Sequence, residues 1–175
     1  MNLAGVAELA DALASGASDR KIIGVRLSSP AHIERQQKYS MPDCIFCKII
    51  NKEIPAHIVW EGEHFIAFLD MFPVNPGHLL LVPREHFETI FNMPANLYKE
   101  LFEKAKVLST PLQKAMGSKK IGYVVEGFGV PHSHLHIVPI NQAHDLDSSR
   151  ATAMPEEEMK EVAEKIKKQI EQDTQ

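Results

Sequence analysis

The spacing of hydrophobic and polar residues predicts several short elements in the first half of the well-patterned region. Residues 44–50 have the pattern of a short helix. Residues 57–61 and 64–69 are two runs of β-type composition with Gly62 between them, which predicts a pair of strands joined by a turn. A turn-rich loop follows, and the apolar run 78–83 predicts a third strand.

The second half of the chain predicts two longer helices and a further strand. Residues 94 to about 116 carry apolar side chains at helical spacing, namely Leu97, Leu101, Ala105 and Leu108. Residues 121–126 predict a strand, and residues 155–172 predict a charged helix with a thin apolar stripe. That stripe consists of Met159, Val162, Ile166 and Ile170. Strand pairs with a helix inserted between them predict an α+β fold with an antiparallel sheet.

The run from Pro131 to Pro139 carries three histidines at alternate positions. Successive side chains of a strand point to opposite faces, so His132, His134 and His136 would share one face of the last strand of the sheet. Imidazole is the side chain whose ordinary pKa lies near neutrality, so such a face suits a nucleophile, a proton carrier or a metal site. The alternative is a histidine cluster without function on a solvated strand.

The composition is that of an ordinary globular domain and excludes some functions. The net charge of −4 gives no support to a nucleic-acid-binding surface. No apolar run approaches the about 20 residues that span a bilayer, so we expect no membrane segment. The two cysteines, Cys44 and Cys47, are spaced C-x-x-C, too few for a disulfide scaffold. They indicate a reducing compartment, the cytoplasm, and a metal-binding or redox role.

Three blocks of the sequence together resemble the histidine triad (HIT) family, in its Hint-type bacterial branch. The blocks are residues 44–50 with 53–55, residues 67–70 with 76–78 and 82–86, and the His-x-His-x-His run. The resemblance implies a five-stranded antiparallel sheet with two main helices. It also implies a homodimer that binds a purine nucleotide or nucleotide conjugate through the α-phosphate.

The resemblance assigns roles to three residues, and the strand pattern assigns one to a fourth, His136. His134, the middle histidine, matches the family nucleophile that attacks the α-phosphorus and forms a nucleotidyl-histidine, which water then hydrolyses. His136 on the same strand face would bond a phosphate oxygen, and His78 matches a histidine that holds the triad. Asp70 matches the acid that receives the ribose hydroxyls. The alternatives are a turn cap for Asp70 and a surface histidine at a strand end for His78.

A second group of residues predicts a structural zinc site. Cys44, Cys47, His86 and His132 supply two thiolates and two imidazoles, the usual tetrahedral ligand set of structural zinc. Some bacterial relatives in the family carry zinc on matching positions. The alternative for the two cysteines is a buried apolar pair. Zinc at these residues would join the first helix to the segment that carries His134.

The loop before the histidines departs from the family pattern. Family members usually carry Asn and then a loop that ends in Gly-Gln-Ser or Gly-Gln-Thr, whose side chains bind phosphate and assist the leaving group. Here the loop is shorter, with Phe128 at the usual Gln position and Gly129 at the usual Ser or Thr position. Gly127 and Gly129 could still bring backbone amides close to a phosphate.

Three functions are compatible with these residues. The first is an enzyme, a nucleotide hydrolase or nucleotidyltransferase that acts at the α-phosphate of a nucleoside phosphoramidate or dinucleoside polyphosphate. The second is a nucleotide-binding module with little turnover, because the polar loop is missing. The third is a metal-dependent hydrolase that uses His132, His134 and His136 together as ligands.

Residues 1–40 differ in composition from the rest of the chain. Codons for Ala4-Gly5-Val6 and Ser29-Pro30-Ala31 can be reverse complements, like the two sides of a tRNA acceptor stem, and Gly24-Val25-Arg26 permits the GTTCGA of a T arm. One interpretation is therefore a tRNA gene translated from an early start, with Met41 as the true start. The other is a disordered or weakly helical tail.

The sequence thus predicts three parts of the chain. Residues 1–40 form an extra N-terminal segment, residues 41–145 form a HIT domain, and residues 146–175 form a C-terminal linker and helix.

Overall fold

The computed structural model describes residues 43–174, and the predicted extra segment 1–40 lies outside them. The helices are α3 (Ile45–Ile50), α4 (Ala95–Met116) and α5 (Glu156–Thr174), with short 3-10 turns η2 (Ile90–Asn92) and η3 (Ser148–Arg150). The strands are β1 (Ile58–Glu61), β2 (Phe65–Leu69), β3 (Leu79–Pro83), β4 (Lys120–Val124) and β5 (Leu135–Ile140). Every predicted element is present, with its ends moved by up to a few residues.

The five strands form one antiparallel sheet in the order β1-β2-β3-β5-β4. The predicted α+β fold with a five-stranded antiparallel sheet is therefore confirmed. β5 lies between β3 and β4, so His136 is paired with Leu80 on one side and Val124 on the other. The third histidine of the run consequently lies in the interior of the sheet, where its backbone is fixed by two neighbouring strands.

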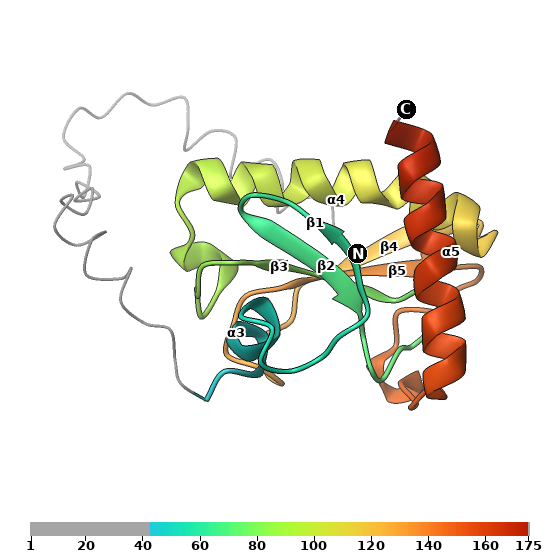
Figure 1. Cartoon of the computed structure of the whole chain (residues 1–175), viewed down its shortest axis with the longest axis horizontal. Helices are drawn as coiled ribbons and strands as arrows, with labels where there is room; N and C mark the ends of the chain where they lie inside the picture. The colour runs from blue at the N-terminus through green and yellow to red at the C-terminus, as the bar shows by residue number, and fades with distance from the viewer. Residues whose placement is uncertain (1–42, 175) are drawn as a thin grey trace, which may run out of the picture. The chain divides into compact units, whose positions relative to one another are not determined.

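Strand alternation gives the sheet two different faces. Residues such as Leu79, Leu81 and Ile137 point into the main core, which α4 and α5 cover. Residues such as Phe68 and Leu80 point the other way and pack beneath α3. Figure 1 shows α4 and α3 on opposite sides of the sheet, and the orange segment after β5 returns on the side of α3. His78 and His136 belong to this second face, by the same alternation.

The predicted periodicity of the two long helices corresponds to their buried sides. In α4 the predicted Leu97, Leu101, Ala105 and Leu108 are all buried. The helix ends at Gly117, whose φ of 62° is the left-handed conformation that favours glycine at a helix C-terminus. In α5 Met159, Ala163 and Ile166 are buried, while the predicted Val162 and Ile170 are only partly buried. α5 packs on α4 and β1, and so belongs to the same core as the predicted HIT domain.

The histidine run is only partly a strand, and this prediction was wrong for residues 131–134. β5 begins at Leu135, and His132 lies in a bend. Pro131 has no backbone N–H to donate to a ladder. The N–H of His132 bonds the carbonyl oxygen of Val130, and the N–H of Ser133 bonds that of Phe87, instead of joining the ladder. His132 therefore does not share a regular strand face with His134 and His136.

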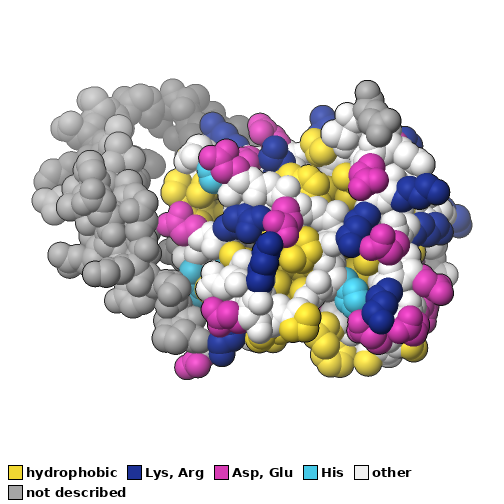
Figure 2. Space-filling view, viewed as in Figure 1, with side chains coloured by type: hydrophobic (Ala, Val, Ile, Leu, Met, Phe, Trp, Pro, Cys, Tyr) yellow, Lys and Arg dark blue, Asp and Glu magenta, His cyan; other side chains and the backbone are white. Residues whose placement is uncertain are grey.

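The surface of residues 43–174 carries both signs of charge. Figure 2 shows Lys and Arg side chains mixed with Asp and Glu over the face in view. Ion pairs such as Arg84–Glu61 and Lys114–Asp173 contribute to this pattern. Within the described residues, none of the helices has the length and apolar character that crossing a membrane requires.

Candidate functional site

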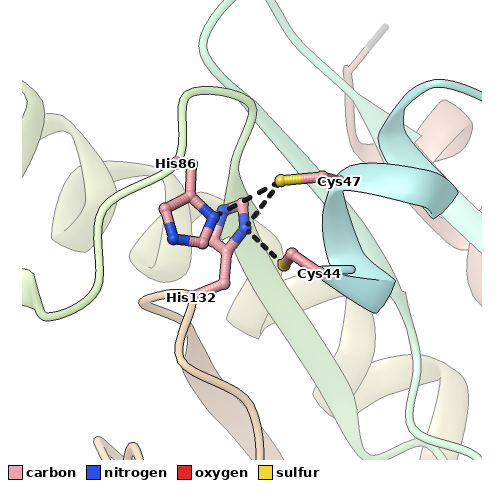
Figure 3. Close-up of side chains that lie close together, drawn as sticks. All are labelled: Cys44, Cys47, His86 and His132. Carbon is pink, nitrogen blue, oxygen red and sulfur yellow. Dashed lines mark hydrogen bonds between the residues drawn. The ribbon is translucent and has the colours of Figure 1, made fainter. Parts of the chain in front are cut away.

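Cys44, Cys47, His86 and His132 come together at one end of the sheet face that α3 covers. Their four ligand-type atoms all lie within 4.8 Å of one another. The Sγ of Cys44 lies 3.4 Å from His132 Nδ1, and the Sγ of Cys47 lies 3.4 Å from His86 Nδ1 and 3.6 Å from His132 Nδ1. Figure 3 shows both sulfurs, at the end of α3, facing the two rings. Residues up to 88 positions apart in sequence thus form one compact cluster.

Three distances between ligand atoms of this cluster, 3.4, 3.4 and 3.6 Å, match those of a tetrahedral metal site, and its hydrogen bonding also suits one. A tetrahedral zinc ion with bonds of about 2.0–2.3 Å holds its ligand atoms roughly 3.3–3.8 Å apart. The Nε2–H of His132 donates to the carbonyl oxygen of Pro83 at 2.9 Å, which leaves the lone pair of Nδ1 facing the sulfurs. Histidine ligands of metals are usually oriented in this way by a carbonyl or carboxylate. Burial lowers the pKa of His132 to about 4 and also lowers the pKa of His86. Both rings are therefore neutral near pH 7, and each has a lone pair that a metal ion can bind.

His134 is buried next to this cluster and is fixed by the backbone. Its Nδ1 lies 2.7 Å from the carbonyl oxygen of His132, so Nδ1–H donates and Nε2 keeps a free lone pair. The ring packs edge-on against Phe46 of α3, with 5.1 Å between centroids. A neutral imidazole with one nitrogen anchored to a carbonyl and the other unprotonated is the form that acts as a nucleophile.

His78 and His136 form a hydrogen-bonded pair beside His134. The Nε2 of His78 lies 2.8 Å from Nδ1 of His136, and the backbone N–H of Val74 points to Nδ1 of His78 at 3.4 Å. If Val74 donates to Nδ1 of His78, that ring carries its proton on Nε2 and donates to His136. His136 then accepts at Nδ1 and carries its own proton on Nε2. The prediction that His78 holds the triad is consistent with this contact.

Burial keeps this pair uncharged. It lowers the pKa of His136 to about 4, with further lowering from His134 and His78. Burial also lowers the pKa of His78, although the carboxylate of Asp70, 3.6 Å from its Nδ1, raises it in part. Near neutral pH the two rings are therefore donors and acceptors of hydrogen bonds rather than cations.

Asp70 stands at the end of β2 with one carboxylate oxygen in use. Its Oδ1 accepts the backbone N–H of Phe72 at 2.9 Å, which is the turn cap that the sequence left as an alternative. Its Oδ2 faces His78. A carboxylate has about four lone-pair positions, so this cap leaves capacity for a ribose diol.

The loop between β4 and the histidines is open. Gly127 and Gly129 are exposed, and a Cβ added to either would meet no atom of the described residues within 4 Å. The side chain of Phe128 is 95% exposed. Neither glycine lines the cavity that borders His136, so the predicted approach of their amides to a phosphate stays a prediction.

The three histidines of the run do not form one metal set. Within residues 43–174 the side chains that could hold a metal form two groups, the Cys44 cluster and Asp70 with His78 and His136. His132 belongs to the first group, His136 to the second and His134 to neither. This division disfavours the hydrolase that would use all three histidines as ligands of one metal.

A polar cluster near the site was not predicted from the sequence. Asn75, Asp145 and Arg150 bond one another, and Asp145 is buried. Residues 141–152 have no hydrophobic period, so no element was predicted there. The one available signal was an acid and an arginine five positions apart in an otherwise polar loop.

Comparison with known proteins identifies the family. Residues 51–143 match the HIT domain family. The chain is 44% identical over 105 residues to the HIT-like protein MJ0866 of Methanocaldococcus jannaschii, covering 55% of this chain and 78% of that protein. It is 31% identical over 114 residues to adenylylsulfatase HINT3 of Arabidopsis thaliana, covering 62% and 58% of the two chains.

A solved structure agrees with this result. The hypothetical histidine triad nucleotide-binding protein ST2152 of Sulfolobus tokodaii strain7 is 29% identical, with a TM-score of 0.67. The match covers 74% of this chain and 93% of that one. The resemblance predicted from the three sequence blocks is thereby confirmed at the level of the family: the chain belongs to the HIT family.

Proposed function

We propose that this protein binds a purine nucleotide conjugate and cleaves it at the α-phosphate through a nucleotidyl group on His134. The observation that carries the proposal is the 2.7 Å bond from Nδ1 of His134 to the His132 carbonyl, because in the neutral ring it places the lone pair on Nε2. Two relatives support the substrate class by their names, a nucleotide-binding protein and an adenylylsulfatase.

The reaction takes place in two displacements. His134 Nε2 attacks the α-phosphorus of a nucleoside phosphoramidate, and the P–N bond of the substrate breaks. The amine leaves with the electron pair of that bond and a proton that its nitrogen has taken from solvent. Water then attacks the phosphorus, loses a proton to solvent, and the electron pair of the His134–phosphorus bond returns to the imidazole. The products are the nucleoside monophosphate and the free amine.

His136 is suited to stabilise the charge that develops on phosphorus. In the tautomer given above, its Nε2–H is a free donor, and a non-bridging phosphate oxygen beside His134 would accept it. The ring centroids of His134 and His136 lie 4.8 Å apart, close enough to contact one phosphate. His78 positions this donor from behind through its own Nε2–H. A donor fixed before the reaction needs no reorganisation when charge develops.

Asp70 is proposed to bind the ribose hydroxyls, and the glycines at 127 and 129 to offer amides to the phosphate. Phe128 and Gly129 replace the Gln and the Ser or Thr that assist the leaving group in the family, and this replacement affects which substrate the site can cleave. The nitrogen of a P–N bond is readily protonated, so a phosphoramidate depends least on an acid from the protein. The same replacement favours a second candidate function, a nucleotide-binding module with little turnover. In that case the nucleotide would bind without reacting.

We also propose that Cys44, Cys47, His86 and His132 hold a structural zinc ion. The support is the set of 3.4–3.6 Å ligand contacts and the Nε2–H bond of His132 to Pro83. The ion when bound would cross-link α3, the segment after β3 and the bend before β5, and would supply no chemistry to the reaction. Thiolate ligands of this kind suit a reducing compartment such as the cytoplasm.

The edge of the sheet supports a homodimer. β4 is an edge strand, and apolar side chains are exposed on and beside it and on α4. Val107 is 65% exposed and Val125 is 43% exposed. An unpaired strand edge next to exposed apolar side chains is a natural surface for pairing with a second copy.

Replacing His134 with alanine should lower kcat for a purine nucleoside phosphoramidate by roughly a thousandfold or more, as loss of a nucleophile does. Binding of the monophosphate, measured by calorimetry, should remain because the ribose contact lies at Asp70. His64→Ala, at an exposed histidine paired with Glu100, is the matched control. Full turnover in His134→Ala would exclude this nucleophile. Tight binding with no turnover in the wild type would favour the binding module.

The neutral state of His136 predicts how stability changes with pH. Its pKa is about 4 in the folded protein and about 6.5 when unfolded, so the unfolded chain binds the extra proton between these values. The free energy of unfolding should therefore fall as pH is lowered from about 6.5 towards 4. His136→Asn should show a shallower fall in denaturant titrations over this range, because other titrating groups are common to both proteins. Equal slopes would contradict the neutral assignment.

Zinc binding predicts that Cys44→Ser lowers metal content and melting temperature together. The wild type should contain about one zinc per chain by elemental analysis, and chelation should lower its melting temperature by several degrees. The isosteric serine keeps the packing around α3 while removing a thiolate. His57→Asn, at a histidine paired with Glu156 away from the cluster, should keep its zinc. A metal-free wild type with unchanged stability would refute the site.

A dimer through β4 and α4 predicts that Val107→Asp and Val125→Asp each produce a monomer by sedimentation analysis. The new carboxylate would be buried without a partner in the interface, which is costly. Phe91→Asp is the control, since Phe91 is 86% exposed but lies in η2, away from β4. A monomeric wild type, or dimers in both variants, would rule out this interface.

A further inference from the structure

A cavity of about 100 Å³ lies on the sheet face that carries His78 and His136. Its floor is formed by side chains of β4 and β5, and one wall by the residues that follow β2. The opposite wall is the segment after β5, which the proposed reaction does not use. The lining combines polar side chains, namely Asp70, His78, Glu126 and His136, with several aliphatic ones.

The segment that borders this cavity, residues 145–151, is held in place by contacts within the protein. The guanidinium of Arg150 pairs with the buried carboxylate of Asp145 and donates to Oδ1 of Asn75 at 3.3 Å. Asn75 in turn donates to the carbonyl oxygens of Asp145 and Pro139, at 3.1 and 2.9 Å. Leu146 packs against Gly122 of β4, where an added Cβ would come within 2.7 Å of it. A wall fixed in this way can discriminate between groups of different size.

The cavity borders His136 but not the proposed nucleophile, His134. The ring centroids lie 5.1 Å apart for Phe46 and His134, 4.8 Å apart for His134 and His136, and 5.0 Å apart for His136 and His78. His136 and His78 line the cavity, whereas His134 and Phe46 do not. A leaving group departs from phosphorus on the side opposite the attacking atom. A phosphate between His134 and the cavity would therefore direct its leaving group into the cavity.

We propose that this cavity is the leaving-group subsite, and that it takes the small aliphatic substituent of an amine. The proposal rests on the proposed function. Five of the lining residues are aliphatic, namely Val74, Val124, Val138, Leu146 and Ala151. Sites for drug-sized ligands usually measure about 300–1,000 Å³. A cavity of about 100 Å³ therefore has room for a short alkyl chain and is too small to enclose a second nucleotide.

Charge narrows the class of amine further. Glu126 contributes a carboxylate to the lining that the proposed nucleotide contacts do not use, whereas Asp70 is assigned to the ribose; within residues 43–174 no lysine or arginine lines the cavity. His78 and His136 are neutral near pH 7 because burial lowers the pKa of each. The subsite accordingly favours an alkyl amine or an aminoalkyl amine over an amine that carries a carboxylate.

The test compares two substrates of one purine nucleoside, the unsubstituted 5′-phosphoramidate, which releases ammonia, and the N-propyl phosphoramidate. Ala151→Leu and Val124→Phe each place extra carbon atoms in the cavity. Each should lower kcat/KM for the N-propyl substrate by about tenfold or more, since a filled pocket discriminates at this level. For the unsubstituted substrate kcat/KM should change less than about threefold. Ala153→Leu makes the same exchange at an exposed residue outside the lining and should affect neither substrate.

A second comparison tests the charge preference. The wild type should hydrolyse an N-aminopropyl phosphoramidate faster than an N-carboxyethyl one, and Glu126→Gln should reduce that ratio by roughly twofold to fivefold, as expected for an exposed charge. An unchanged ratio would overturn the charge assignment.

Three outcomes of the first test would overturn the subsite. Equal loss for both substrates, together with weaker binding of the monophosphate, would mean that the ribose occupies the cavity. No effect of either filling variant would mean that the cavity is not used. Failure of the wild type to hydrolyse both substrates would overturn the proposed function, and the leaving-group subsite with it.

Discussion

One residue, His132, connects the two chemical centres of this protein. Its ring lies in the Cys44 cluster, with Nε2–H bonded to Pro83 and Nδ1 facing the sulfurs. Its carbonyl oxygen accepts Nδ1–H of His134 and so sets the tautomer of the proposed nucleophile. Any displacement of His132 would move that carbonyl by a similar amount. A metal bound at the cluster would therefore not contact His134. It would fix the position of His134 through the backbone carbonyl of His132, which accepts Nδ1–H of His134.

This connection depends on the bend that interrupts the histidine run. In a regular strand alternate side chains share a face, and His132 would point where His134 and His136 point. Because Pro131 cannot join the ladder and β5 starts at Leu135, His132 turns towards α3 while His136 stays on the sheet face. The same three-histidine motif thus supplies a ligand-type residue, a buried ring with a free Nε2, and a donor held by His78. Their environments differ although they are spaced two residues apart.

Much of the fold and of the site could be predicted from the sequence, because its strongest signals are local. The stripe at Leu97, Leu101 and Leu108 indicated α4 even though Pro111 lies inside the helix, since the buried side continues through Leu112. The residue types at Cys44, Cys47, His86 and His132 indicated a cluster that the fold does assemble.

The features that escaped prediction depend on contacts between distant segments. The bend at His132 depends on a bond to Phe87, 46 residues earlier than Ser133, and the cavity wall depends on Asn75 meeting Asp145 and Arg150. Neither leaves a periodic pattern in the sequence.

The proposed reaction requires a covalent bond between His134 and the nucleotide, and peptide mapping by mass spectrometry tests for it directly. The wild-type protein would be mixed with a purine nucleoside phosphoramidate, quenched at high pH during turnover and digested. We expect the peptide containing His134 to gain the mass of the nucleotidyl group at that histidine, and the same peptide of His134→Ala to gain none. A nucleotidyl group on another residue, or one that still forms in His134→Ala, would contradict the proposed reaction.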